Sequence, residues 1–181
     1  MSTFAPQFCD RRQHNPHDFL TLILFNLNKE LKIQNEFFIE KTFEGTFQKR
    51  FRCQRCNSIS YSKKQDKFFV LNIPASSPNV YERDMRRCLR ELTNETDIEW
   101  SCSKCDREDI ESKLSLFISK LPKILIIRLK PSVGYNSLVL YDFKLDIAEF
   151  FKGENCTNEV TQYNLIGVVN HYGTNSGGHC K

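Results

Sequence analysis

Two pairs of cysteines, each with a two-residue spacer, constrain the fold of this chain more than any other feature of its sequence. Cys53 and Cys56 form one C-x-x-C pair, and Cys102 and Cys105 form the other, 45 residues further along. Such a spacer lets both sulfur atoms of a turn point at one ion, and two such turns supply the four thiolates of a tetrahedral zinc site. Four protein ligands leave no position for water, so we predict a structural Zn²⁺ ion.

Two other interpretations of these cysteines stay open, namely unrelated reduced thiols or a redox pair. Neither pair stands at the start of an amphipathic helix, where a redox thiolate would be stabilised. Of the eight cysteines, Cys88 occupies an apolar position of an expected helix and is interpreted as a buried residue, while Cys9 and Cys156 lie in polar surroundings. No secretory signal opens the sequence, so we expect reduced thiols in an intracellular protein of the cytoplasm or nucleus.

Composition limits the remaining classes. The 181 residues suffice for one domain with its own core, and 40% hydrophobic with 27% charged residues argues against disorder. No apolar run approaches the roughly 18 residues of a membrane span, so we expect no membrane partner. A net charge of only +4 gives little support to nucleic-acid binding. A zinc-ribbon nucleic-acid module remains an alternative, with phosphate contacts from Lys49, Arg50, Arg52, Arg55, Lys63 and Lys64. The other interpretation of these six is a solvated strand face.

The residue pattern predicts a mixed fold. Asn15 and Pro16 are a typical helix start, and apolar residues at helical spacing extend the helix to about residue 31. We expect strands within 37–61 and at 68–73, 114–118, 124–129 and 163–169, the fourth apolar enough to be central in a sheet. A second helix is expected over 81–92, after a turn at 76–79.

Histidines offer a further candidate site. A strand, a glycine-rich turn and then His179 at the start of the next strand would fix an imidazole at the rim of a sheet. A general base must be held in this way, within hydrogen-bond reach of a nucleophile. The alternative for His179, and equally for His171, is a surface residue beside glycines. His14 and His17 flank the expected helix start and are interpreted as capping or surface residues.

Five motifs in order resemble the ubiquitin-specific protease family of deubiquitinases. QHNPHDFL at 13–20 resembles the signature Q-Q-D-A-H-E-F-L, and FEG at 43–45 with the first cysteine pair resembles F-x-G…C-x-x-C. Cys88-Leu89 and the second pair match the next elements. LPKILIIRLK at 121–130 is similar to L-P-x-x-L-I-I-H-L-K-R-F, and 163–179 resembles Y-x-L-x-x-V-x-x-H-x-G…G-G-H-Y.

The resemblance implies an α+β fold, that of a papain-like cysteine peptidase with fingers, palm and thumb, mostly antiparallel sheet and zinc-ribbon fingers. It implies one partial catalytic domain over 1–181, with a residual thumb helix region at 1–40, fingers at 41–119 and palm at 120–181. Most of the thumb is missing. The four paired cysteines would hold the zinc, and His179 would be the general base. Substrate contacts are expected from Gln13, Asp18 and His171.

The implied substrate is ubiquitin joined through its C-terminal glycine to a lysine, bound by a monomer. A cysteine thiolate would attack that carbonyl and form a thioester, which water then hydrolyses. The family's nucleophile box, G-N-T-C-Y-x-N-S, has no counterpart here, and neither does the Asp or Asn that orients the histidine. Cys9 lacks the residues of that box. Further departures are Asn15, Pro16, Arg128 and Cys180, which replace Asp, Ala, His and Tyr.

We therefore expect the chain, as given, to be inactive in hydrolysis by itself. It is interpreted as part of a protease domain, or alternatively as a non-catalytic protein that binds ubiquitin or scaffolds a complex. Removing zinc is expected to unfold residues 41–119, because the binding free energy of a structural zinc is folding free energy. With most of the thumb missing, helix 16–31 should expose an apolar patch.

Overall fold

The structure is a computed structural model that describes residues 5–10, 13–75, 82–130, 138–152, 160–174 and 177–181. Its helical elements are η1 (Pro6–Phe8), α1 (Pro16–Ile33), α2 (Phe38–Phe43), α3 (Met85–Thr93) and η2 (Ala148–Phe150). Its strands are β1 (Gly45–Cys53), β2 (Ile59–Tyr61), β3 (Asp66–Phe68), β4 (Leu71–Pro74), β5 (Glu82–Asp84), β6 (Thr96–Cys102), β7 (Arg107–Lys120), β8 (Ile127–Lys130), β9 (Leu138–Leu140), β10 (Lys144–Asp146), β11 (Gln162–Asn164), β12 (His171–Thr174) and β13 (Gly177–Cys180).

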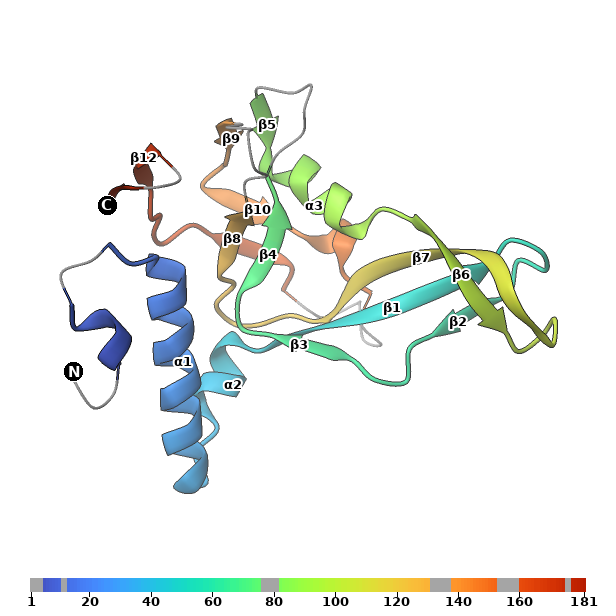
Figure 1. Cartoon of the computed structure of the whole chain (residues 1–181), viewed down its shortest axis with the longest axis horizontal. Coiled ribbons are helices and arrows are strands. Elements are labelled where there is room, and N and C mark those ends of the chain that lie inside the picture. Colours follow the sequence, from blue (N-terminus) through green and yellow to red (C-terminus); the bar gives the residue numbers. More distant parts are fainter. Residues whose placement is uncertain (1–4, 11–12, 76–81, 131–137, 153–159, 175–176) are drawn as a thin grey trace.

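A long antiparallel ribbon extends from one end of the molecule (Figure 1). Its strand order is β2-β1-β7-β6, and β3 also pairs with β1. The β1–β7 register runs from Phe47 opposite Ile118 to Cys53 opposite Ser112. A bulge interrupts it between Thr46 and Phe47, where the ribbon leaves the body, and there Thr46 Oγ1 lies 2.7 Å from Ser119 Oγ. The ribbon thus carries the first cysteine pair outward on a continuous ladder.

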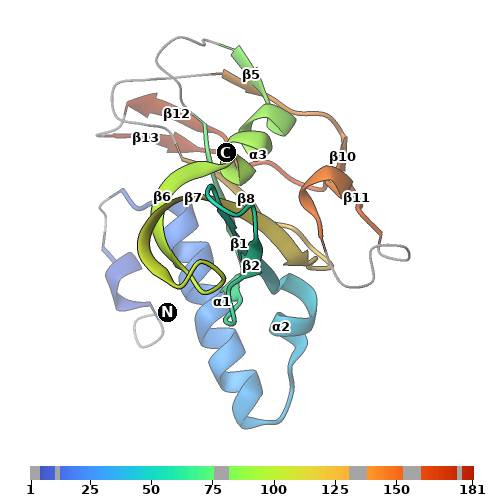
Figure 2. The same cartoon turned by 90° about the vertical axis from the view of Figure 1, so that its right-hand side faces the viewer.

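The hydrophobic core lies at the base of this ribbon. It is formed by β4, α3, the C-terminal end of β7 and the segment around η2. The most deeply buried large side chains there are at most 1% exposed, namely Leu71, Ile73, Leu89, Ile118 and Ile147. Alternate residues of β4 are buried, as a strand with one face on a core requires. β4 pairs in parallel with β8, so the core joins segments far apart in the sequence. Viewed along the ribbon, β10 and β11 lie on one side of this body and β12 and β13 on the other (Figure 2).

Helix α1 begins as the sequence predicts. Asn15 is its N-cap, and the Asn15 side chain accepts a hydrogen bond from the His17 amide at 2.9 Å. Pro16 occupies the first turn, where its missing N–H costs no hydrogen bond. Leu24 is buried, but Phe25 is 61% and Ile33 76% exposed. The helix therefore exposes two large apolar side chains, and the continuous apolar patch that we expected stays a prediction.

The segment before β1 was predicted incorrectly. We expected strand structure from residue 37, but Phe38–Phe43 forms the short helix α2, whose length of 6 residues is too small for a clear helical period. Glu44 and Gly45 follow directly. A Cβ atom at Gly45 would lie 2.3 Å from Cζ of Phe68, so only glycine lets that ring cover the start of β1.

Other elements differ from prediction in extent or in pairing, and the strand expected at 114–118 is the longer β7. The strand expected at 68–73 is two strands, β3 and β4, and the helix expected at 81–92 begins only at Met85, where Asp84 accepts a hydrogen bond from the Arg87 amide at 2.6 Å. The strand expected at 163–169 is limited to β11. Among the described residues, β8 pairs only with β4, so it is an edge strand and not a central one. The turn expected at 76–79 and Cys156 lie outside the described residues.

In the part of the chain that the structure describes, no helix combines the length and apolar character of a membrane span.

Candidate functional site

Four cysteine sulfur atoms form a compact cluster at the outer end of the ribbon. Cys53 ends β1 and Cys102 ends β6, while Cys56 and Cys105 stand in the turns that follow them. All four Sγ atoms lie within 4.8 Å of one another. Two of the separations are 3.9 Å, from Cys53 to Cys105, and 3.7 Å, from Cys56 to Cys102. All four are free thiols, and these distances are far longer than the about 2.05 Å of a disulfide.

These separations match the size of a tetrahedral metal site. A tetrahedron of sulfur ligands with bonds of about 2.3 Å to zinc has edges of about 3.8 Å. The geometry therefore brings together all four residues that the spacing singled out, at distances that one metal ion can bridge.

Each cysteine turn is folded by its own local sequence. Asn57 and Asp106, which directly follow Cys56 and Cys105, have φ angles of 55° and 48°. Asparagine and aspartate tolerate this left-handed conformation better than other non-glycine residues. The amide of Asn57 donates to the Cys53 carbonyl at 2.9 Å, which closes the first turn. Strand pairing through β7 then brings the two preformed turns together.

Ser58 is a member of this site that sequence reasoning missed. Its hydroxyl lies 3.1 Å from the Cys56 sulfur and 3.4 Å from that of Cys102, and the residue is 9% exposed. The Ser58 hydroxyl lowers the pKa of Cys102 to about 6 and also lowers the pKa of Cys56. The hydrogen bond with Cys56 is the main cause that raises the pKa of the Cys105 thiol, to about 12. A hydroxyl that donates to the Cys102 sulfur favours the thiolate form that metals bind.

The two histidines near the C-terminus lie on opposite faces of the β12–β13 hairpin. His171 is opposite Cys180, and Tyr172 is opposite His179. Because side chains alternate along a strand, His171 shares a face with Cys180, while His179 shares the other face with Tyr172. Both histidines are exposed. The imidazoles of His179 and His171 therefore point to opposite faces of the hairpin and do not belong to one site. Cys180 lies on the face away from His179.

The signature segment meets the histidine hairpin directly. The side-chain oxygen of Gln13 accepts a hydrogen bond from the Gly178 amide at 2.8 Å. Gln13 precedes α1 by only three positions, and Gly178 precedes His179 by one. The structure thus joins Gln13, one of the predicted site residues, to the glycine beside His179, although the two are far apart in the sequence.

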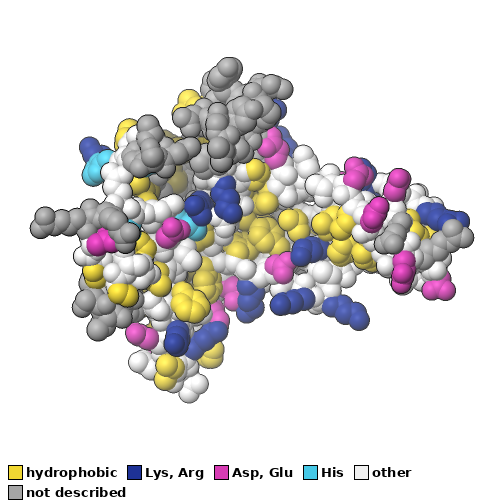
Figure 3. Space-filling model, in the orientation of Figure 1, with side chains coloured by type: hydrophobic (Ala, Val, Ile, Leu, Met, Phe, Trp, Pro, Cys, Tyr) yellow, Lys and Arg dark blue, Asp and Glu magenta, His cyan; other side chains and the backbone are white. Residues whose placement is uncertain are grey.

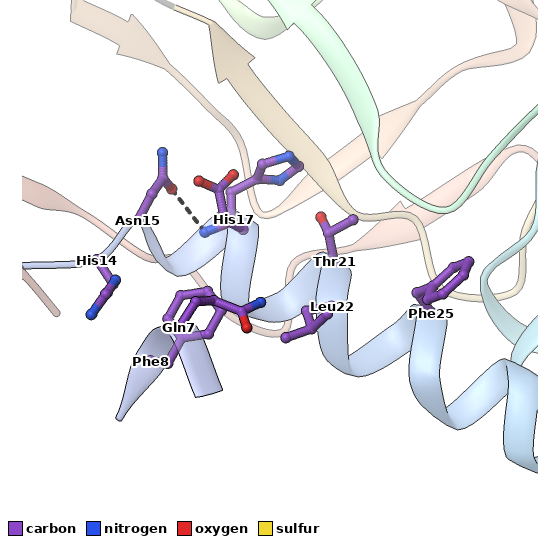
Figure 4. A pocket seen from close by; sticks show the side chains of 9 residues that line it. Gln7, Phe8, His14, Asn15, His17, Thr21, Leu22 and Phe25 are labelled. Atoms are coloured by element: carbon purple, nitrogen blue, oxygen red, sulfur yellow. Dashed lines mark hydrogen bonds between the residues drawn. The ribbon is translucent and has the colours of Figure 1, made fainter. Parts of the chain in front are cut away.

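An open groove runs along α1 (Figure 4). Its volume is about 480 Å³, and its lining residues are Gln7, Phe8, His14, Asn15, His17, Asp18, Thr21, Leu22 and Phe25. Asp18 is exposed in the first turn, where a carboxylate is favoured by the helix dipole. Burial lowers the pKa of His17, the cations of Arg128 and Lys130 lower it further, and Asp18 opposes them. Figure 3 shows basic side chains over β8 beside a histidine and an acidic side chain of α1.

The basic residues of β1 are engaged within the sheet. Lys49 pairs with Asp66 at 3.0 Å, and Arg50 and Arg52 both pair with Glu95. Two carboxylates, Asp66 and Glu95, thus pair with three of the six basic residues that the nucleic-acid hypothesis requires.

Comparison with known proteins is consistent with this site and fold. The sequence matches the family described as "Ubiquitin carboxyl-terminal hydrolase" over residues 1–180. It is 29% identical to ubiquitin carboxyl-terminal hydrolase 4 of Saccharomyces cerevisiae (strain ATCC 204508 / S288c) over 162 residues, which are 76% of this chain and 17% of the yeast protein. It is 31% identical to ubiquitin carboxyl-terminal hydrolase 2 of Gallus gallus over 154 residues, covering 78% of this chain and 41% of the chicken protein.

Solved structures share the fold. The SAGA DUB module of Ubp8, Sgf11, Sus1 and Sgf73 bound to monoubiquitin matches with a TM-score of 0.81 and 20% identity, over 99% of this chain and 42% of the matched chain. The same module bound to ubiquitin aldehyde matches with a TM-score of 0.78 and 18% identity, over 99% of this chain and 43% of the matched chain.

The fold is that of a ubiquitin-specific protease catalytic domain, mixed α+β and mostly antiparallel, with its four paired cysteines gathered as in a zinc ribbon. This chain belongs to the ubiquitin carboxyl-terminal hydrolase family. It spans about a sixth of the length of the yeast relatives that it matches.

Proposed function

We propose that this chain is the part of a ubiquitin-specific protease domain that supplies the zinc-ribbon fingers and the general base. The reaction of the domain is hydrolysis of the bond between the C-terminal glycine of ubiquitin and a lysine. The observation that carries this proposal is the family match over residues 1–180. In this proposal residues 1–40 belong to the thumb, 41–119 to the fingers and 120–181 to the palm.

His179 is the proposed general base. Its exposed imidazole projects from strand β13, on the face away from His171 and Cys180. In the reaction it would take the proton of a cysteine thiol, and the thiolate would attack the glycine carbonyl to form a thioester. The imidazolium would then return the proton to the leaving lysine amine, and the same base would activate the hydrolytic water.

The four paired cysteines are proposed to hold one Zn²⁺ ion in a closed structural site. The support for this is the match between the sulfur separations and the edge of a zinc tetrahedron. When bound, the ion neutralises thiolate charge and crosslinks the two turns. It has no open position for substrate, so its effect is on the shape of the ribbon.

The partner that we propose is ubiquitin, bound by a monomer in the cytoplasm or nucleus. Asp18 on the α1 groove and His171 on the hairpin are the proposed substrate contacts. We further propose that the 181 residues bind ubiquitin without forming a thioester, because the sequence contains no G-N-T-C nucleophile box. That property also describes a non-catalytic ubiquitin-binding protein, the second candidate.

Two measurements with the same chain test this proposal. Fluorescent monoubiquitin should bind in an anisotropy titration, and ubiquitin with a C-terminal electrophile should leave the mass of the chain unchanged. Covalent labelling would show a working nucleophile and contradict the inactive assignment, with Cys9→Ser and Cys180→Ser then identifying the sulfur atom. Absence of ubiquitin binding would contradict the proposed partner. The variant Asp18→Asn should weaken binding, whereas Lys152→Ala, a substitution of an exposed residue just after η2, serves as the control.

A further inference from the structure

The amide of Gly178 lies on the outer edge of strand β13. Asn170 and Lys181 exchange two backbone hydrogen bonds, at 2.7 and 3.0 Å. Bonded and non-bonded pairs alternate along an antiparallel ladder, so the pair of Gly173 and Gly178 is a non-bonded one. Its N–H groups therefore point away from the partner strand, and β12 offers the amide of Gly178 no acceptor.

Gln13 supplies the acceptor that the hairpin lacks. Its Oε1 atom lies 2.8 Å from the Gly178 nitrogen, across 165 positions of sequence. Gln13 is itself placed by the start of α1, because Asn15 caps that helix and fixes the direction in which the chain enters it. A side chain two residues before the N-cap of an 18-residue helix thus holds the outer edge of a short hairpin.

The hairpin leaves no room for a residue with a Cβ atom at position 178. A Cβ atom there would lie 2.3 Å from Nε2 of His171 and 2.4 Å from the carbonyl oxygen of Tyr172. The imidazole of His171 covers one face of this glycine, and Gln13 occupies its edge. Protein groups therefore occupy both the face and the edge of this glycine.

We propose that Gln13 is a positioning residue for His179, and not a substrate contact. By holding the amide of Gly178, it fixes β13 against the start of α1, and the next residue of that strand carries the base. The importance of this contact for the reaction rests on the proposed function, in which His179 is the general base. The contact itself is a property of the free chain.

Nuclear magnetic resonance of the isotopically labelled chain tests the proposal without substrate. The unmodified protein should show a coupling across the hydrogen bond between the Gly178 nitrogen and the side-chain carbonyl carbon of Gln13. In Gln13→Leu, the Gly178 amide signal should move upfield and its hydrogen exchange should accelerate about tenfold. In Gln13→Glu, which keeps an acceptor oxygen, the signal should stay downfield and exchange should remain slow. The His179 ring signals should shift in Gln13→Leu and return toward their original positions in Gln13→Glu.

The matched control is Gln7→Leu, which makes the same change in the same N-terminal region. Gln7 lines the α1 groove, so its replacement should leave the Gly178 and His179 signals unchanged. The proposal is overturned if the coupling is absent, if Gln13→Leu leaves the Gly178 amide unchanged, or if Gln7→Leu has an equal effect. A separate ubiquitin titration distinguishes the two proposals: loss of ubiquitin binding with intact hairpin signals refutes the function alone.

Discussion

Replacing Cys102 by serine should release the metal and open the outer half of the ribbon. Structural zinc sites of this kind contribute about 10–16 kcal/mol of apparent binding free energy at neutral pH, compared with about 5–15 kcal/mol for the stability of a whole domain. The other contacts at this end are small. Phe51 stacks on Trp100 with ring centroids 5.0 Å apart, and such a pair adds about 0.5–1.5 kcal/mol beyond area burial. The metal term is therefore larger by about a factor of ten.

Native mass spectrometry and hydrogen exchange measure the two consequences separately. The unmodified chain should carry one zinc ion, and Cys102→Ser should carry none. Amides near Cys53 and Trp100 should lose protection, while those of Leu71 and Leu89 in the core should keep most of theirs, because the core lies at the other end of the ribbon.

The control is Cys9→Ser, which removes an exposed thiol outside the cluster and should leave one zinc ion bound. The reasoning is refuted if the unmodified chain carries no metal and a chelator leaves the protection of the ribbon unchanged. Loss of protection over the whole of 41–119, core included, is the wider unfolding that we expected from the sequence, and it would contradict the restriction to the outer half that the position of the core predicts.

Three further substitutions probe other contacts. Ser58→Ala removes the hydroxyl beside two sulfur atoms and should weaken zinc about 10–100-fold in a chelator competition. Burial raises the pKa of Glu44, but its hydrogen bonds to Lys67 and Lys120 lower it more, so the folded pKa lies below the ordinary 4.5. The ion pairs then stabilise the fold above that pH and are lost as the pH falls, so Glu44→Gln should cost about 1–2 kcal/mol in urea unfolding at pH 7 and less below pH 4.5. Asn57→Val should destabilise the first cysteine turn by about 1–2 kcal/mol, because its φ is 55°.

A specific result would contradict each of these three predictions. Equal zinc affinity in Ser58→Ala would remove the hydroxyl from the site. A stability difference for Glu44→Gln that grows on acidification would reverse the sign of the linkage. Asn57→Gly is the control for the third, since glycine adopts the same φ without strain, and equal losses in Asn57→Gly and Asn57→Val would point to the side chain rather than the backbone.

The cysteine cluster could be predicted from sequence because its spacing is local within each turn. A two-residue spacer gives the turn, and the choice of four sulfur ligands follows from the chemistry of zinc. The 45 residues between the two pairs do not indicate how far apart the two turns lie in space. The β6–β7 and β1–β7 pairings bring Cys102 to Cys56. Ser58 was missed because a serine in a polar turn has no distinguishing pattern. For the positive φ of Asn57, the sequence offered only a residue type that tolerates that conformation.

Helix α1 could be predicted because its cap, its proline and its apolar period agree. The errors fall where an element is short or its partner is distant. Six residues of α2 carry less than two turns of period, so the aromatic residues there resembled a strand. The apolar run at 124–129 favoured a central strand. Among the residues that the structure describes, only Ile127–Lys130 of this segment pairs in a sheet, and it pairs with one neighbour, β4. The role of Gln13 depends on a contact across 165 positions, which no local pattern reports.

The bulge between Thr46 and Phe47 gives the ribbon a pivot. From Phe47 to Cys53 there are six residue steps, about 20 Å of strand at the usual rise. A rotation of about 10° at the bulge would therefore carry the sulfur cluster through about 3.5 Å, more than half the width of the cluster's own tetrahedron. A metal ion held by the four cysteines would stiffen the tip of the ribbon without setting its angle. The direction of the ribbon is set at its base. There the hydroxyl oxygens of Thr46 and Ser119 lie 2.7 Å apart and join β1 to β7 across the bulge.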